Sequence, residues 1–183
     1  MSDASANDIV LAAGPAGFGD GKHPTTAGVL AALEAIDPEM FQPERAADIG
    51  AGSGILSFAI ASRFGCPVWA GELSAQAVET LRKNIEANGY AGRIHPVSTN
   101  GFDHPALKKE APFDLIVMNI LAEPLLDLAA DAERMLARDG VLILSGMLSW
   151  QEPQIREAYQ AIGLELAARL TLQDWVTLSF VKP

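Results

Sequence analysis

"DIGAGSGIL", residues 48–56, decides the fold, because three glycines stand between an apolar run and a run of helical length. The preceding segment, "RAADIG" (45–50), has the length and composition of a short buried strand. Gly50, Gly52 and Gly54 allow the backbone to turn sharply and to approach a ligand closely. The stretch therefore predicts a strand, a binding turn and a helix whose N-terminus offers unpaired amides to that ligand.

The same alternation continues along the chain. Further strands are expected at 67–73, 93–99, 113–121 and 141–146, helices at 25–36, 74–89, 123–140 and 151–163, and two closing strands after 163. Thr25 or Thr26 is the expected N-cap of the first of these helices. This order predicts an α/β fold: a mostly parallel sheet with helices on both faces and an antiparallel C-terminal hairpin. Ligands of such sheets bind at the carboxyl ends of the strands.

Length and composition indicate one globular domain over residues 1–183, with residues 1–8 frayed and "IVLAAG" (9–14) a further candidate strand. Hydrophobic residues make up 49% of the chain, but none of the apolar runs reaches the roughly 18–20 residues of a membrane span. The acidic start is unlike a secretory signal. Cys66 is the single cysteine, which indicates a cytoplasmic protein without an internal disulfide.

The formal net charge of −10 argues against direct, non-specific binding of nucleic acid, which requires a basic surface. It fits a basic partner such as a lysine-rich protein, although acidity can also serve solubility alone. His23, His95 and His104 are scattered, and no ligand spacing typical of metal sites occurs. No metal site and no membrane role are expected, and the oligomeric state cannot be deduced from the sequence.

The spacing of the glycines distinguishes between ligands. A dinucleotide fingerprint reads G-x-G-x-x-G, whereas here the pattern is G-x-G-x-G, led by Asp48 two residues earlier. This acid-leading form is typical of methyltransferases that use S-adenosylmethionine, whose cationic amino-acid end favours a nearby carboxylate. A plain strand-to-helix turn and a nicotinamide oxidoreductase are the alternatives.

Polar residues also follow the next three strands. Glu72 stands about 20 residues beyond the glycines, where a carboxylate can accept hydrogen bonds from ribose hydroxyls. Asn100 is the candidate for the adenine edge, unless it belongs to a plain turn. Asn119 ends an apolar run, where a polar side chain is costly unless it faces a cleft.

"FGDGKHPTT", "DIGAGSGILS", "NILAEPLL" and "LSGML…Q" occur in this order and at spacings that resemble the PrmA family, bacterial methyltransferases of a large-subunit ribosomal protein (L-eleven). The resemblance implies a seven-stranded class I methyltransferase fold that uses S-adenosylmethionine to methylate lysine side chains and an N-terminal amine. By position, Thr26, Gly50, Glu72 and Asn119 match cofactor-contacting residues. The chain departs from the family pattern at Asp20, where a threonine is usual, and at Glu72, where an aspartate is usual.

On this resemblance the loop "GFGDGKHPTT" (17–26) folds back over the cofactor, with Phe18 covering an apolar face and Thr26 bonding the amino-acid end. His23 in this loop is either a general base or a structural residue. Family members also carry an N-terminal substrate-recruiting domain, and this chain is expected to hold the catalytic domain alone.

The function that follows is S-adenosylmethionine-dependent N-methylation of a basic protein, either a ribosomal protein or another lysine-rich one. The carbonyl oxygen of Asn119 is the candidate for orienting the amine at the catalytic centre. A small-molecule methyltransferase and a non-catalytic nucleoside-binding protein are the alternatives. Trp69, Trp150 and Trp175 are expected to serve packing, and for Trp150, which follows the fifth strand, facing the cleft is the alternative.

Overall fold

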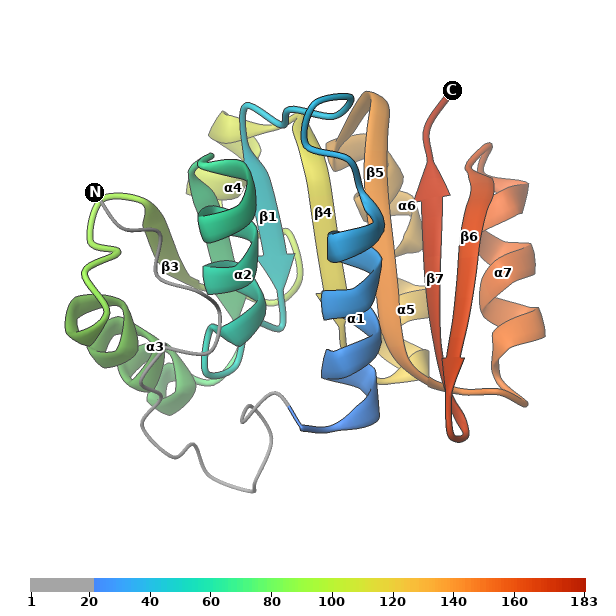
Figure 1. Ribbon diagram of the computed structural model, residues 1–183, viewed down its shortest axis with the longest axis horizontal. Helices are drawn as coiled ribbons and strands as arrows, with labels where there is room; N and C mark the ends of the chain where they lie inside the picture. The colour runs from blue at the N-terminus through green and yellow to red at the C-terminus, as the bar shows by residue number, and fades with distance from the viewer. Residues whose placement is uncertain (1–21) are drawn as a thin grey trace.

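The computed structural model describes residues 22–183. Phe18, Asp20 and the expectations for residues 1–14 lie outside this part of the chain. Seven strands form one sheet in the described residues, in the order β3-β2-β1-β4-β5-β7-β6 (Figure 1). The strands are β1 (Ala46–Ile49), β2 (Val68–Glu72), β3 (Ile94–Ser98), β4 (Phe113–Asn119), β5 (Leu136–Leu148), β6 (Glu165–Leu172) and β7 (Trp175–Val181).

Strands β1 to β5 are parallel, and β7 runs antiparallel to both β5 and β6. The predicted seven-stranded sheet and its C-terminal hairpin are therefore confirmed. Strand order reverses beside β1, whose neighbours are β2 and β4. In open α/β sheets such a reversal opens a crevice at the carboxyl ends of the strands, which places the glycine turn after β1 directly at it.

Two apolar cores cover the two faces of the sheet, with α1 and α2 in front and α5, α6 and α7 behind it in Figure 1. Because side chains alternate along a strand, Leu115 and Val117 of β4 face one core while Ile116 and Met118 face the other. The helices of the first core are α1 (Pro24–Ala35), α2 (Ile55–Phe64) and α3 (Ala75–Ala87). Those of the second are α4 (Pro105–Glu110), α5 (Ala122–Asp127), α6 (Ala129–Met135) and α7 (Glu152–Ala161).

The expected helix over 123–140 is wrong in extent. It is divided at Leu128 and ends at Met135, and the chain enters β5 five residues earlier than expected. Lys182 explains this end, because its Nζ donates to the carbonyl oxygens of Glu133 and Leu136 at 2.8 and 3.0 Å. A cation that satisfies the last carbonyls of a helix stabilises its C-terminus, and here it comes from the far end of the chain.

Two smaller differences concern helix starts. The N-cap of α1 is His23, not Thr25 or Thr26: Nδ1 of His23 accepts a hydrogen bond from the Thr25 amide at 3.4 Å. The short helix α4 was not expected, because six residues carry too little periodicity to be recognised. Within residues 22–183, no helix combines the length and the apolar character needed to cross a membrane.

Candidate functional site at the carboxyl edge of the sheet

The carboxyl edge, where β1 to β5 end, holds a cavity of about 360 Å³. Of the predicted site residues, Gly50, Glu72 and Asn100 line it. Gly71, Ile120 and Leu121 complete much of the wall. The turns after β1, β2 and β3 thus converge on one pocket. This agrees with the prediction of a ligand-binding turn after the first strand.

The carboxylate of Glu72 is fixed at this pocket by two backbone amides. Gly52 N–H donates to Oε2 at 3.0 Å, and Ser74 N–H donates to Oε1 at 3.1 Å. The first bond ties the end of β2 to the glycine turn, and the second ties it to the start of α3. Because a carboxylate accepts up to about four hydrogen bonds, Glu72 keeps acceptor capacity for hydroxyl groups of a ligand.

Glycine is favoured for a different structural reason at each of the three glycine positions of the turn. Gly50 (φ 81°) lies against the Ile120 side chain, and a Cβ there would overlap its Cγ2. At Gly54 (φ 91°) a Cβ would lie 2.5 Å from Leu81 Cδ1, so this glycine serves the packing of α2 on α3. At Gly52 (φ 54°), by contrast, no described atom lies within 4 Å of a Cβ, which leaves the backbone open to a ligand.

Asp48 is fully buried behind this turn. Ser57 Oγ donates to its Oδ2 at 2.6 Å, whereas Oδ1 has no hydrogen-bond partner among the described residues. Burial raises the pKa of Asp48 to about 6, against the lowering effect of the Ser57 hydrogen bond, and the Glu72 charge adds to the rise. A buried carboxylate with one free oxygen is suited to a cationic group, although Asp48 itself does not line the 360 Å³ cavity.

Two further predicted residues, Asn119 and Thr26, lie at the end of β4 and in α1. Asn119 is half-buried at the end of β4, in register with Ser145 of β5, and Thr26 is buried in the first turn of α1. Neither lines the 360 Å³ cavity. Ser145 Oγ donates to the Thr25 carbonyl at 3.3 Å and lies 3.0 Å from Thr177 Oγ1, which holds this turn of α1 on the sheet.

His23 is engaged in the same region. Its Nδ1 lies 2.8 Å from Thr25 Oγ1, and its ring packs edge-on against Trp175, 5.0 Å between centroids. These contacts favour the structural reading of His23 over a general base. Within the described residues, no cluster of three or more potential metal ligands occurs.

Sequence reasoning missed the apolar residues at the pocket. Leu73 and Leu121 are each 70% exposed, yet both line the cavity. Leu73 directly follows Glu72, and Leu121 stands two residues after Asn119. A leucine within two residues of a strand that ends in a polar residue was the available signal, because such a side chain gains most when a ligand covers it.

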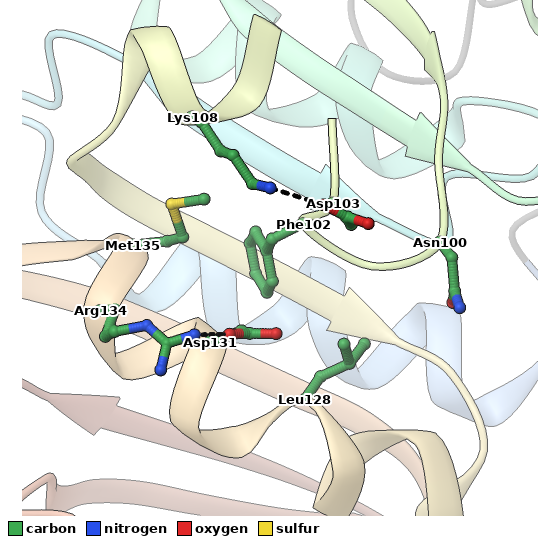
Figure 2. Close-up of a pocket in the computed structure, with 8 residues that line it drawn as sticks. All are labelled: Asn100, Phe102, Asp103, Lys108, Leu128, Asp131, Arg134 and Met135. Carbon is green, nitrogen blue, oxygen red and sulfur yellow. Dashed lines mark hydrogen bonds and ion pairs between the residues drawn. The ribbon is translucent and has the colours of Figure 1, made fainter. Parts of the chain in front are cut away.

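A second pocket of about 590 Å³ adjoins the first and shares Asn100 and Leu128 with it (Figure 2). Asn100 and Leu128 lie at one end of this pocket and Met135 at the other. Its charges are paired, Lys108 with Asp103 at 2.5 Å and Arg134 with Asp131. The pocket therefore extends the first one past Asn100 without offering an unpaired charge for recognition.

The strand order with its reversed β7, the glycine turn after β1 and the fixed acid at the end of β2 define the class I S-adenosylmethionine-dependent methyltransferases. Within that class the chain belongs to the ribosomal protein L11 methyltransferase (PrmA) family, whose profile matches residues 2–183.

Individual relatives agree with this assignment. A ribosomal protein L11 methyltransferase of Chelativorans sp. (strain BNC1) is 40% identical over 161 residues, which are 88% of this chain and 55% of that protein. The chain thus spans about half the length of the curated relatives it matches.

Solved structures agree as well. A ribosomal protein L11 methylase from Lactobacillus delbrueckii subsp. bulgaricus superposes with a TM-score of 0.76 at 30% identity, covering 89% of this chain and 81% of that one. The T. thermophilus 16S rRNA methyltransferase RsmC, solved with AdoMet and guanosine, gives 0.72 at 26% identity, covering 92% and 45%.

Proposed function

We propose that this chain binds S-adenosylmethionine at the carboxyl edge and transfers its methyl group to amino groups of a basic protein, with ribosomal protein L11 as the first acceptor to test. One observation carries the proposal: the carboxylate of Glu72 is held by the Gly52 amide at the wall of a 360 Å³ cavity. This is the arrangement that a nucleoside with free ribose hydroxyls requires.

The described residues fit this cofactor. Glu72 would accept the ribose hydroxyls, Asn100 would meet the adenine edge, and Gly50 and Gly52 would let the backbone approach closely. The free Oδ1 of Asp48 suits the ammonium of the amino-acid end. These roles account for the orphaned oxygen of Asp48, which is otherwise a costly feature of a buried carboxylate.

S-adenosylmethionine supplies an electrophilic methyl group carried on a positively charged sulfur. The chain itself supplies proximity and orientation, which contribute up to roughly 7–11 kcal/mol in favourable cases. Asn119, at the end of β4, would accept a hydrogen bond from the incoming amine through its side-chain carbonyl oxygen. A protonated lysine must lose its proton first, and desolvation beside a positive charge promotes that loss.

Calorimetric titration tests the cofactor. We expect S-adenosylmethionine and S-adenosylhomocysteine to bind the wild type, and Glu72→Ala to weaken both by roughly 10- to 100-fold, because charged hydrogen bonds contribute about 1.5–3 kcal/mol. Glu39→Ala, an exposed acid at the opposite edge, is the matched control and should bind like the wild type. Equal binding by Glu72→Ala would contradict the assignment.

Labelled methyl transfer tests the acceptor. Purified ribosomal protein L11, a whole-cell protein extract and a metabolite pool are each incubated with the enzyme and labelled cofactor. Label in L11 supports the proposal, and label in other extract proteins alone changes the acceptor. Label confined to metabolites identifies a small-molecule methyltransferase, whereas binding without any transfer identifies a nucleoside-binding protein.

A further inference from the structure

Trp150 stands exposed at the carboxyl edge, outside both cores. Its side chain is 75% exposed, so the expectation that it serves packing is wrong. Trp69, by contrast, stacks on His95 at 4.9 Å between centroids, and Trp175 packs against His23. A tryptophan side chain combines a large apolar surface with a polar N–H, which suits it to contacts with a partner.

The turn that carries Trp150 is held by hydrogen bonds on both sides. Ser149 N–H donates to the Asp174 carbonyl at 2.9 Å, which ties the turn to the β6–β7 turn. Gln151 Oε1 accepts a hydrogen bond from Leu148 N–H at 2.9 Å. The indole is thus presented by a fixed backbone, and an anchor that is already ordered loses little entropy on binding.

Trp150 also lies on the acceptor side of the edge. It follows β5, the neighbour of β4 beyond Asn119, and Gly146 of β5 lies directly against the Ile120 peptide. Leu121, 70% exposed, comes next after that peptide. Exposed apolar side chains therefore follow both strands that border the expected catalytic residue.

Cations are distributed unevenly between the turns at the two edges. All thirteen Lys and Arg residues lie within 22–183, yet the turns at 50–54, 73–74, 99–104, 120–121, 149–151 and 173–174 contain none of them. Lys22 precedes α1, and Lys108, Arg156 and Arg169 approach this edge from neighbouring elements in ion pairs with Asp103 and Glu152. Exposed acids occur on the acceptor side, Glu123 in the first turn of α5 and Asp174 beside Ser149.

The opposite, amino edge carries both signs, because its cations stand beside acids: Arg45 pairs with Glu44, and Lys182 pairs with Glu133. Arg45, Arg93, Arg138 and Lys182 all stand where parallel strands begin or where β7 ends. Because the carboxyl-edge turns contain no Lys or Arg and exposed acids stand beside Trp150, a cationic polypeptide would be attracted there and nucleic acid phosphates would be repelled.

We propose that Trp150, with Leu121, Glu123 and Asp174, forms the docking surface for the basic polypeptide whose amino group is methylated. Trp150 anchors an apolar side chain or the aliphatic stem of a lysine, and the two acids pair with cations that flank the accepted amine. Binding hot spots of protein interfaces are commonly formed by a tryptophan at the centre of the interface with charged residues around it. This inference rests on the proposed function, since it names how that same site selects its acceptor.

The test uses purified ribosomal protein L11 as the probe in two assays. Calorimetric binding in the presence of S-adenosylhomocysteine needs no turnover, and methyl-transfer kinetics separate kcat from KM. For Trp150→Ala and Trp150→Glu we expect binding of the protein to weaken, and KM to rise, by 10-fold or more. Affinity for the cofactor and kcat should stay within about 2-fold, because the residue touches only the acceptor.

Met40→Ala and Met40→Glu are the matched controls, since Met40 is an 85% exposed hydrophobe between α1 and β1, at the amino edge. Both should behave as the wild type. Glu123→Lys and Asp174→Lys should raise KM and reduce the salt dependence of binding, while Glu39→Lys should not.

Unchanged L11 binding in Trp150→Glu overturns the docking surface, as does an equal loss in Met40→Glu. Wild-type protein that does not bind L11 overturns it as well. Binding that depends on Trp150 without any methyl transfer supports the docking surface and refutes the proposed function, so the two failures are distinguishable.

Discussion

The carboxyl edge consists of two halves that are built differently. Around the ends of β1, β2 and β3 the site is made by backbone: glycines with positive φ, and amides that fix the carboxylate of Glu72. Around β4, β5 and the β6–β7 turn it is made by side chains at or just after strand ends, chiefly Asn119 and Trp150, and Leu121 borders both halves. We call these the cofactor half and the acceptor half, after the roles proposed for them above.

The difference concerns how each half tolerates change. A site made by backbone fails when a Cβ is added, because the conformation itself is the recognition element. A site made by exposed side chains keeps its fold when one of them is replaced and loses only the interaction. Substitutions in the cofactor half should therefore alter stability and binding together, and those in the acceptor half should separate the two.

Gly50→Ala should have the largest effect. Its positive φ and the overlap with the stiff, β-branched Ile120 together cost about 3 kcal/mol or more of the free energy of unfolding. Denaturant unfolding measures this, and cofactor binding should be lost in parallel. Gly52→Ala, with no described atom nearby, should lose only about 1 kcal/mol of stability but should also weaken cofactor binding. Equal stability of the two variants would refute the packing role of Gly50.

Asp48→Asn should separate stability from binding within the cofactor half. The folded-state pKa of Asp48, about 6, lies above the reference value of 3.8. As pH rises from about 4 to 6, the unfolded chain releases this proton before the folded one, so the wild type loses stability over that window. The loss totals about 3 kcal/mol and then stays constant.

Asp48→Asn removes that loss, so the variant should unfold at higher denaturant concentration than the wild type at pH 7 but not at pH 4. Its affinity for S-adenosylmethionine should fall about 10-fold, since the ammonium loses its charged partner. Asp174→Asn, an exposed carboxylate, is the control and should show neither change. A wild type whose stability does not fall between pH 4 and 6 would contradict the buried charge.

Much of the cofactor half could be predicted from sequence because its determinants are local. The glycines Gly50, Gly52 and Gly54 stand where the backbone has a positive φ angle, so the residue type itself indicates the turn. The position of Glu72 could be predicted because it ends the next strand of the same strand–helix–strand unit, about 20 residues further along the chain. The parallel strands could also be predicted, because strands buried on both faces are continuous apolar runs in the sequence. Strand β4, for example, has four consecutive buried residues.

The parts that could not be predicted depend on contacts distant in sequence. The end of α6 is set by Lys182, which lies 46 residues beyond Leu136. The exposure of Trp150 depends on how the β6–β7 turn meets β5, which no periodicity reveals. The division of Asn119 and Glu72 between two halves likewise follows from strand order, not from the spacing of either residue.

Asn119→Ala tests the acceptor half, where activity should change and the fold should not. The loss of an acceptor for the amine should lower kcat about 100-fold, as for other single groups that orient a reacting atom. Affinity for the cofactor should fall less than kcat does, and the free energy of unfolding should stay within about 0.5 kcal/mol, because the side chain is only half-buried. A cofactor loss as large as the kcat loss would move Asn119 to the cofactor half.

Ser145→Ala should have the smallest effect and the most local one. Its Oγ lies 3.3 Å from both the Thr25 and the Val176 carbonyl oxygens and shares its one proton between them, so its removal should cost about 1 kcal/mol of stability. Hydrogen exchange should accelerate first in the opening turn of α1, which carries Thr26. Ser149→Ala is the matched control, because the Asp174 carbonyl it contacts is also bound by its own backbone amide. If exchange rises evenly across the sheet instead, Ser145 supports the core in general and does not set the position of α1, and the acceptor half is then less rigid than its strand ends imply.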